Sequence, residues 1–337
     1  MWSVKILKAI ASRILFYGTI VLAAWWWMLW TPGFIGVRQR ALNADEVDVE
    51  REVRSDIGVL AKTIGERNVP HKSDQLDQAA EFICNAMNAA GYRPASQWYT
   101  AAGKECRNIE AEVHGTDRVG EVVIVGAHYD TVPGSPGADD NATGVAVMLA
   151  LARRFARTQP ARTLRFVAFT NEEPPYFWTA DMGSVVYAKQ CREHGDRVAA
   201  MLSIESVGYY SNLPNSQRYP AGLGLLYPSR GDFVAFVGNV TSRSLVHNAL
   251  GTFRRAAALP SIGAAVPNAV PGAGWSDHWS FWKQGFSAIE ITDTAPYRNR
   301  NYHTDEDTPD RIDYDRLARF TWAMQAVVTE LASPAPR

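Results

Sequence analysis

Imidazole and carboxylate side chains, the types that bind metal ions, follow a short apolar segment of this sequence. The segment 121–144 (EVVIVGAHYDTVPGSPGADDNATG) places His128, Asp130 and Asp140 after the β-branched run 122–125. Such a run predicts a strand that is buried on both faces of a parallel sheet. His128 and Asp130 are two residues apart, so both would point to one side beyond the strand. Acidic groups gathered there without Lys or Arg are costly unless a cation binds, which predicts half of a metal site.

Side chains of the same kinds follow three further predicted strands. They are Glu172 and Glu173 after 163–170, Glu205 in 199–209, and His303 after 287–292. Ligand sites in open α/β sheets lie beyond the carboxyl ends of the strands. A Glu pair is usually a solvated surface feature and a single His is usually structural, but here the whole set recurs at strand ends. Mixed His and carboxylate ligands suit zinc or a similar first-row metal.

Alternating strands and helices must position these groups. The sequence predicts helices at 47–67, 74–90, 142–155, 182–193, 242–257 and 312–331, a hairpin of 98–100 with 108–113, and a further strand at 232–239. We expect Ser73 to be the N-cap of the second helix and Gly91 to end it. Strands that alternate with helices indicate a three-layer α/β domain with a mostly parallel sheet.

The first thirty residues differ from the rest of the chain. Lys5, Lys8 and Arg13 precede the uncharged run 14–30 (ILFYGTIVLAAWWWMLW), which is rich in Trp. The run can cross a hydrocarbon core of about 30 Å, and Trp is typical of the membrane interface. Trp also occupies the place where a cleaved signal peptide needs small residues, so we predict an uncleaved anchor rather than a signal peptide or a core helix. The upstream basic residues predict a cytoplasmic N-terminus and a domain on the periplasmic or extracellular side.

The predicted organisation has five parts. They are a basic cytoplasmic N-terminus (1–13), a transmembrane signal anchor (14–30), a linker (31–46), one soluble domain (47–331) and a tail (332–337). The 337 residues carry a formal net charge of -1, which does not favour nucleic-acid binding. The three cysteines are too scattered for a CxxC zinc site, and a disulfide between Cys84 and Cys106 remains an open alternative.

Five motifs occur in the order known from one enzyme family. They are HYD, GADDNATG, NEEPPYF…MGS, SDHWSFW and YHTDEDTPD. With them the sequence closely resembles the M28 family of zinc aminopeptidases over about 47–331. The resemblance implies the three-layer zinc-exopeptidase fold, whose central mixed sheet is mostly parallel and is flanked by helices. It also implies zinc as the cofactor, with two ions per chain.

The resemblance assigns roles to individual residues. The implied metal ligands are His128, Asp140, Glu173, Glu205 and His303, with Glu172 as the general base and Asp130 as the partner that orients His128. Asp140, not Asp139, matches the bridging carboxylate. Asp277 belongs to a segment that lines the site in the family, although a helix-start Asp is equally a cap.

Glu205 departs from the family pattern, because many members have an Asp at this position. The extra methylene implies either a strand that is set further back or a second metal bound in altered geometry and more weakly. The unassigned segments 211–224 and 260–274 are expected to shape the pocket for the first side chain of the substrate.

The leading interpretation is a membrane-anchored metallo-aminopeptidase. It would hydrolyse the N-terminal bond of a peptide with a free N-terminus, through a metal-activated water and a Glu base. One alternative is a glutaminyl cyclase-like acyltransferase with one zinc, for which Asp140, Glu172, Glu173 and His303 would suffice. The other is a catalytically inactive binding domain of the same fold, although each ligand position holds a competent residue.

Overall fold

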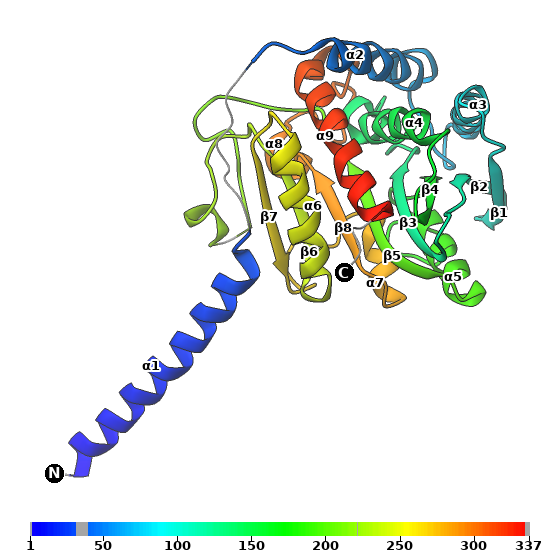
Figure 1. Cartoon of the computed structure of the whole chain (residues 1–337). Coiled ribbons are helices and arrows are strands. Elements are labelled where there is room, and N and C mark those ends of the chain that lie inside the picture. The colour runs from blue at the N-terminus through cyan, green and yellow to red at the C-terminus, as the bar shows by residue number, and fades with distance from the viewer. Residues whose placement is uncertain (1, 32–39, 221, 334–337) are drawn as a thin grey trace.

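The computed structural model describes residues 2–31, 40–220 and 222–333, and its core is one eight-stranded sheet (Figure 1). The strands are β1 (Ala95–Ala101), β2 (Lys104–Val113), β3 (Arg118–His128), β4 (Arg162–Phe169), β5 (Arg197–Glu205), β6 (Val234–Asn239), β7 (Ser261–Val266) and β8 (Ala288–Thr292). Their order in the sheet is β1-β2-β4-β3-β5-β8-β6-β7. The central strands β4, β3, β5 and β8 are parallel, and so is the outer pair β6–β7. The pairs β1–β2, β2–β4 and β6–β8 are antiparallel, so the sheet is mixed and mostly parallel, as predicted.

Helices cover both faces of the sheet. The helices are α2 (Ala44–Ile57), α3 (Ser73–Ala89), α4 (Gly144–Phe155), α5 (Gly183–His194), α6 (Arg243–Ala256), α7 (His278–Lys283), α8 (Ala295–Arg298) and α9 (Tyr314–Ala332). Val123 and Val125 of β3 pack in the cluster that contains α4, α6 and α9, whereas Val122 and Ile124 pack with α5 and α7. This alternation follows from the period of a strand, and it makes the uniformly apolar run of β3 a strand buried on both sides.

Four sequence predictions about the elements were wrong in detail. The segment 260–274 contains strand β7, which the sequence does not reveal because SIGAAV has small residues and a central Gly. Strand β5 ends at Glu205, since Ser206 takes a left-handed conformation with φ of 44°. Ser73 is the first residue of α3, and its N-cap is Lys72, which makes no side-chain cap. The predicted helix 47–67 is α2 followed by a π-type segment, 58–64.

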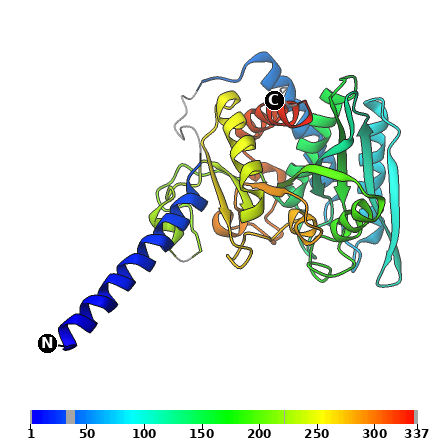
Figure 2. The same ribbon diagram turned by 60° about the horizontal axis from the view of Figure 1, so that its bottom comes forward.

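Helix α1 (Trp2–Leu29) projects away from the domain, as Figures 1 and 2 show. Its segment Ile6–Leu29 has a mean hydropathy of 1.7 and is not buried in the domain, so it is long and apolar enough to cross a membrane. The last turn contacts α6: the guanidinium of Arg243 lies 4.1 Å from the Trp27 ring centroid and donates a 2.9 Å hydrogen bond to the Trp27 carbonyl. The predicted linker and tail lie partly outside the described residues, at 32–39 and 334–337.

The three cysteines, all within the described ranges, are free thiols. The disulfide between Cys84 and Cys106 that the sequence left open is therefore not formed. Cys106 lies buried on β2, and burial raises the pKa of its thiol.

Candidate metal centre

The sheet brings the predicted site residues together at the carboxyl ends of β3, β4 and β5. His128 is the last residue of β3 and Glu205 the last residue of β5. Gly126 pairs with Ser203, so by alternation His128 and Glu205 project from the same face. The Nε2 atom of His128 lies 3.1 Å from a Glu205 carboxylate oxygen.

Asp140 lies between the two imidazoles. One of its carboxylate oxygens is 3.2 Å from Nε2 of His128, and the other is 3.0 Å from Nε2 of His303. Glu173 approaches the same His303 nitrogen to 3.3 Å. Two groups of ligand-type atoms therefore share Asp140, one with His128 and Glu205 and the other with Glu173 and His303.

The adjacent residues Glu172 and Glu173 point to different parts of this cluster. An oxygen of Glu172 lies 4.0 Å from His128, whereas Glu173 faces His303. Asp130 fixes the backbone of the pair, because its two oxygens accept the N–H groups of Glu172 at 3.0 Å and Glu173 at 3.1 Å. Nδ1 of His128 lies 3.2 Å from the Asp130 backbone carbonyl and 3.6 Å from its carboxylate, so Asp130 contacts both sides of the cluster.

The two acids of the GADDN motif have different surroundings. Asp139 is turned away from the imidazoles, and it accepts hydrogen bonds from the Gly208 N–H and the Asn299 amide, both at 2.9 Å. Asp307, which the sequence did not single out, accepts the N–H groups of Asp139 at 2.9 Å and Asp140 at 3.1 Å. The choice of Asp140 over Asp139 agrees with this geometry. The acidic run in YHTDEDTPD was the available signal for Asp307.

Serine hydroxyls hold the Glu205 carboxylate. Ser206 donates to one oxygen at 2.9 Å and Ser276 to the other at 2.8 Å. Ser276 was not predicted, and it precedes the predicted site residue Asp277. Glu205 ends β5, and its carboxylate reaches His128.

Asp277 occupies the N-cap position of α7 but makes no capping hydrogen bond, so the capping alternative is wrong. Its side chain is fully buried, and burial raises its pKa to about 7. Burial raises the pKa of Glu172 well above its ordinary value, and the charges of neighbouring acids, Asp277 among them, add to this effect.

A buried arginine supports the loop that carries the cluster. Arg67 is fully buried, and its guanidinium donates hydrogen bonds to the carbonyls of Tyr129, Leu60, Gly65, Pro136 and Gly137. These acceptors are backbone carbonyls and not carboxylates. The acidic groups therefore have a cation nearby, contrary to the prediction from sequence, but it forms no ion pair with them among the described residues.

The electrostatics of the cluster fit a bound cation. Burial, followed by the charge of Asp140, raises the pKa of Glu173 to about 8. Burial also acts to raise the pKa of Asp140, but hydrogen bonds to both imidazoles hold it well below its ordinary value. Burial acts to lower the pKa of His303, yet the carboxylates raise it to about 10. Within the described residues, Nε2 of His128 and Oε1 of Glu173 are buried without a hydrogen-bond partner, as expected for atoms that bind a metal.

The last glycine of GADDNATG is required by a close approach. A Cβ on Gly144 would lie 2.3 Å from Oδ1 of Asn141 and 2.4 Å from the Ile204 carbonyl. Asn141 joins this turn to β5, since its amide donates to the Ile204 carbonyl at 2.8 Å. Gly144→Ala is expected to destabilise the protein by about 1–3 kcal/mol through overpacking, measured by denaturant unfolding.

Gly58→Ala is the matched control for this prediction. Gly58 has a helical φ of -59°, and a Cβ there would meet no atom within 4 Å. This substitution should be neutral or stabilising by about 0.4–1 kcal/mol. Equal effects at the two glycines would contradict the argument from close approach.

Comparison with known proteins agrees with this fold. The model of peptidase family M28 matches residues 108–328, more than half of the chain. The protein YfbL of Escherichia coli is 36% identical over 286 residues, which cover 82% of this chain and 85% of YfbL. Leucine aminopeptidase 1 of Arthroderma otae is 26% identical over 81% of this chain and 72% of its own length.

Solved structures share the architecture at low sequence identity. BSAP, a zinc aminopeptidase from Bacillus subtilis, has a TM-score of 0.65 at 16% identity, over 86% of this chain and 96% of BSAP. A glutaminyl cyclase from Bacteroides thetaiotaomicron has a TM-score of 0.61 at 15% identity, over 86% of this chain and 99% of the cyclase. These structures establish the fold alone. The family match and the identity to YfbL show that the chain belongs to peptidase family M28. Together with the aminopeptidase relatives, they support a peptidase, an enzyme of the hydrolase class.

Proposed function

We propose that the protein is a two-zinc aminopeptidase that removes the N-terminal residue of peptides. The observation that carries the proposal is the position of Asp140, whose two oxygens face His128 and His303 separately. His128 and Glu205 would hold one ion with Asp140, while Glu173 and His303 would hold the other. Zinc bound there supplies a Lewis acid and lowers the pKa of water.

The remaining chemistry belongs to side chains of the chain. Glu172 lies next to the ligand groups without belonging to the pair that faces His303, so it would take the proton from the attacking water and pass it to the leaving amine. Asp130 would fix the orientation of the His128 ring and the position of the Glu172 backbone. The other ligand side chains are buried while His303 is exposed, and the burial strengthens the interactions of the buried carboxylates.

A cyclase is the second candidate, since glutaminyl cyclases share the fold. It needs a single metal, for which Asp140, Glu173 and His303 would suffice. The complete second group around His128 and Glu205 favours the peptidase. A peptide with N-terminal Gln separates the two, because a cyclase releases ammonia whereas an aminopeptidase releases the free amino acid.

Metal analysis tests the stoichiometry. We expect two zinc ions per chain by mass spectrometry of the native protein. Glu205→Ala and His128→Ala should each lose one ion, and the same one, because both residues belong to one group. A single ion at saturating zinc in the unmodified protein would contradict the two-metal proposal and favour the cyclase.

Helix α1 is the proposed membrane anchor, with the N-terminus in the cytoplasm and the peptidase domain periplasmic or extracellular. Its length, hydropathy and exposure support this assignment. Protease added to the extracytoplasmic side of intact cells or spheroplasts should digest the domain. Digestion only after the membrane is opened would reverse the topology.

A further inference from the structure

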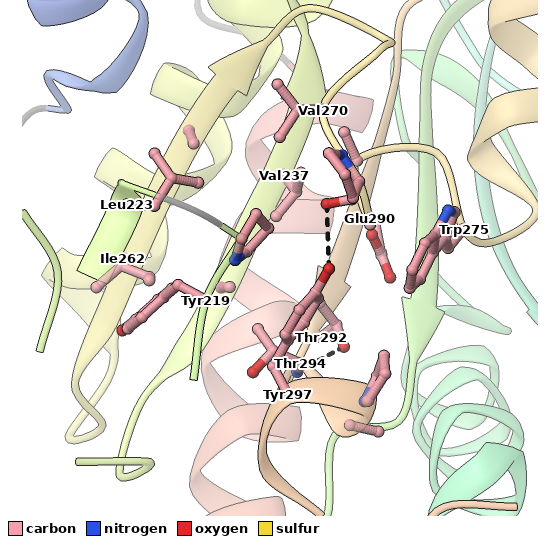
Figure 3. A pocket seen from close by; sticks show the side chains of 18 of the residues that line it. Tyr219, Leu223, Val237, Ile262, Val270, Trp275, Glu290, Thr292, Thr294 and Tyr297 are labelled. Carbon is pink, nitrogen blue, oxygen red and sulfur yellow. Dashed lines mark hydrogen bonds between the residues drawn. The ribbon is translucent and has the colours of Figure 1, made fainter. Parts of the chain in front are cut away.

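An elongated pocket begins at the metal centre and extends across the sheet. Glu205 and Tyr302 line its inner end, and β6, β7 and β8 form its floor. Its empty space, including the part that is open to solvent, is about 890 Å³. The segments around Tyr219 and Trp275 form its walls, as Figure 3 shows. The first belongs to the predicted pocket segment 211–224, and the second adjoins the predicted segment 260–274.

One acidic side chain lies in the floor of this pocket. Glu290 pairs with Ser203 of β5 and with Val237 of β6, so it shares the sheet face that carries Glu205. The floor around it is apolar and includes Val237 and Ile262. The neighbouring β8 residues Ile289 and Ile291 point to the opposite face of the sheet and pack in the hydrophobic core.

Glu290 has no partner in the protein. Its exposed fraction is only 6%, and it forms no hydrogen bond or ion pair with any residue that the structure describes. Burial raises its pKa well above the ordinary value, and the charge of Glu205 adds to this effect. A carboxyl group without a partner in an apolar pocket is costly, which favours a ligand that offers it a hydrogen-bond donor or a positive charge.

Two aromatic rings stand next to this carboxyl group. Trp275 and Tyr297 are stacked with their centroids 6.2 Å apart and their planes at 10°. Burial, followed by the charge of Glu290, raises the pKa of the Tyr297 phenol, and Figure 3 shows Glu290 beside both rings. A carboxylate with aromatic faces is the environment that favours an ammonium or guanidinium group.

A cation of the protein also lines the pocket but does not fill this role. Arg218 has an exposed side chain and lies at the pocket wall. It forms no ion pair with Glu290 within 4.0 Å. The Glu290 carboxyl group is therefore available to a cationic group of the substrate, whose charge would favour the ionised carboxylate.

We propose that Glu290 makes this pocket select substrates whose N-terminal residue is Lys or Arg. The inference rests on the proposed aminopeptidase function, because the pocket starts at Glu205 and so would receive the side chain next to the cleaved bond. The cationic group would reach Glu290, while its aliphatic stem packs on the apolar floor.

The test compares kcat/KM for arginine, lysine, leucine and glutamate 4-nitroanilides with the zinc-loaded protein. We expect the arginine or lysine substrate to exceed the leucine substrate by at least about 10-fold, the size of one charge-assisted hydrogen bond. Glu290→Gln keeps the shape but removes the charge, and it should lower the ratio of arginine to leucine turnover by at least about 10-fold. Glu290→Met should invert the preference in favour of leucine.

The ratio of arginine to leucine turnover does not depend on partial unfolding of a variant, because the same fraction of folded enzyme cleaves both substrates. Asp56→Asn is the control, because Asp56 is a buried acid on α2 that is paired with Arg153. This variant should leave the ratio unchanged. A protein that prefers leucine or glutamate, with a ratio that Glu290→Gln does not alter, would overturn the inference while the aminopeptidase function stands.

Loss of the proposed function would have a different signature. If no anilide is cleaved, the aminopeptidase proposal fails, and calorimetric binding of argininamide and leucinamide then tests the pocket by itself. Tighter binding of argininamide that is lost in Glu290→Gln supports the selectivity. Equal binding of the two amides overturns it.

Discussion

Glu172→Gln is expected to lower kcat by about 10²–10⁴-fold, the usual contribution of a general base. The amide keeps the shape and the polarity of the side chain but cannot accept a proton from water. Metal content should stay at the level of the unmodified protein, since Glu172 belongs to neither of the two groups that share Asp140, although its carboxylate lies close to His128 and Glu173. Steady-state kinetics together with metal analysis provide the measurement.

Glu173→Gln is the matched variant, one residue away and equally buried. It should weaken metal binding, and excess zinc should restore part of the activity. Because bound metal stabilises the folded state by mass action, Glu173→Gln should also melt at a lower temperature unless zinc is added. If Glu172→Gln lost the metal and Glu173→Gln kept it, the two roles would be exchanged.

Arg67→Met is expected to have the largest effect on stability, about 3–5 kcal/mol of unfolding free energy. The substitution leaves five carbonyls without their donor in a fully buried place. Some of these carbonyls belong to the loop between His128 and Asp140, so metal affinity should fall together with stability. Urea unfolding with and without zinc measures both effects.

Arg67→Lys separates charge from geometry. A lysine keeps the positive charge but has three donors on one nitrogen, so it should recover only part of the loss. Arg192→Met is the surface control on α5, and its effect should stay within about 0.5 kcal/mol. If Arg67→Lys were as stable as the unmodified protein, the positive charge would support the loop, and not the set of hydrogen bonds that the guanidinium makes.

The fold and the metal-ligand cluster could be predicted because both depend on local patterns. The β-branched run before His128 and the apolar run before Glu205 predict buried strands, and parallel strands bring their carboxyl ends to one edge. Strand β7 was missed since its Ser, Gly and Ala residues have no β-branched pattern, and its place is fixed by pairing with β6.

The supporting residues could not be predicted in the same way. Arg67 stands at the end of a predicted helix, where an arginine is ordinarily exposed, and only the folded loop supplies its five carbonyls. Ser276 and Asp307 reach the site through contacts between segments that are distant in sequence. Glu290 did leave a signal, because a charged residue in the middle of the apolar strand 287–292 is unusual.

The contacts of α1 with α6 set how the domain would move on a membrane. Arg243 contacts both the ring and the backbone carbonyl of Trp27 at the end of α1. The centroids of the Trp30 and His247 rings lie 5.5 Å apart. With α1 embedded in a bilayer, these contacts would couple the orientation of the domain to that of the helix. The pocket would then stay at a nearly constant height above the lipid surface. Peptides would have to reach that height to be cleaved. The distance of the pocket from the membrane would therefore restrict which peptides are cleaved, independently of their N-terminal side chain.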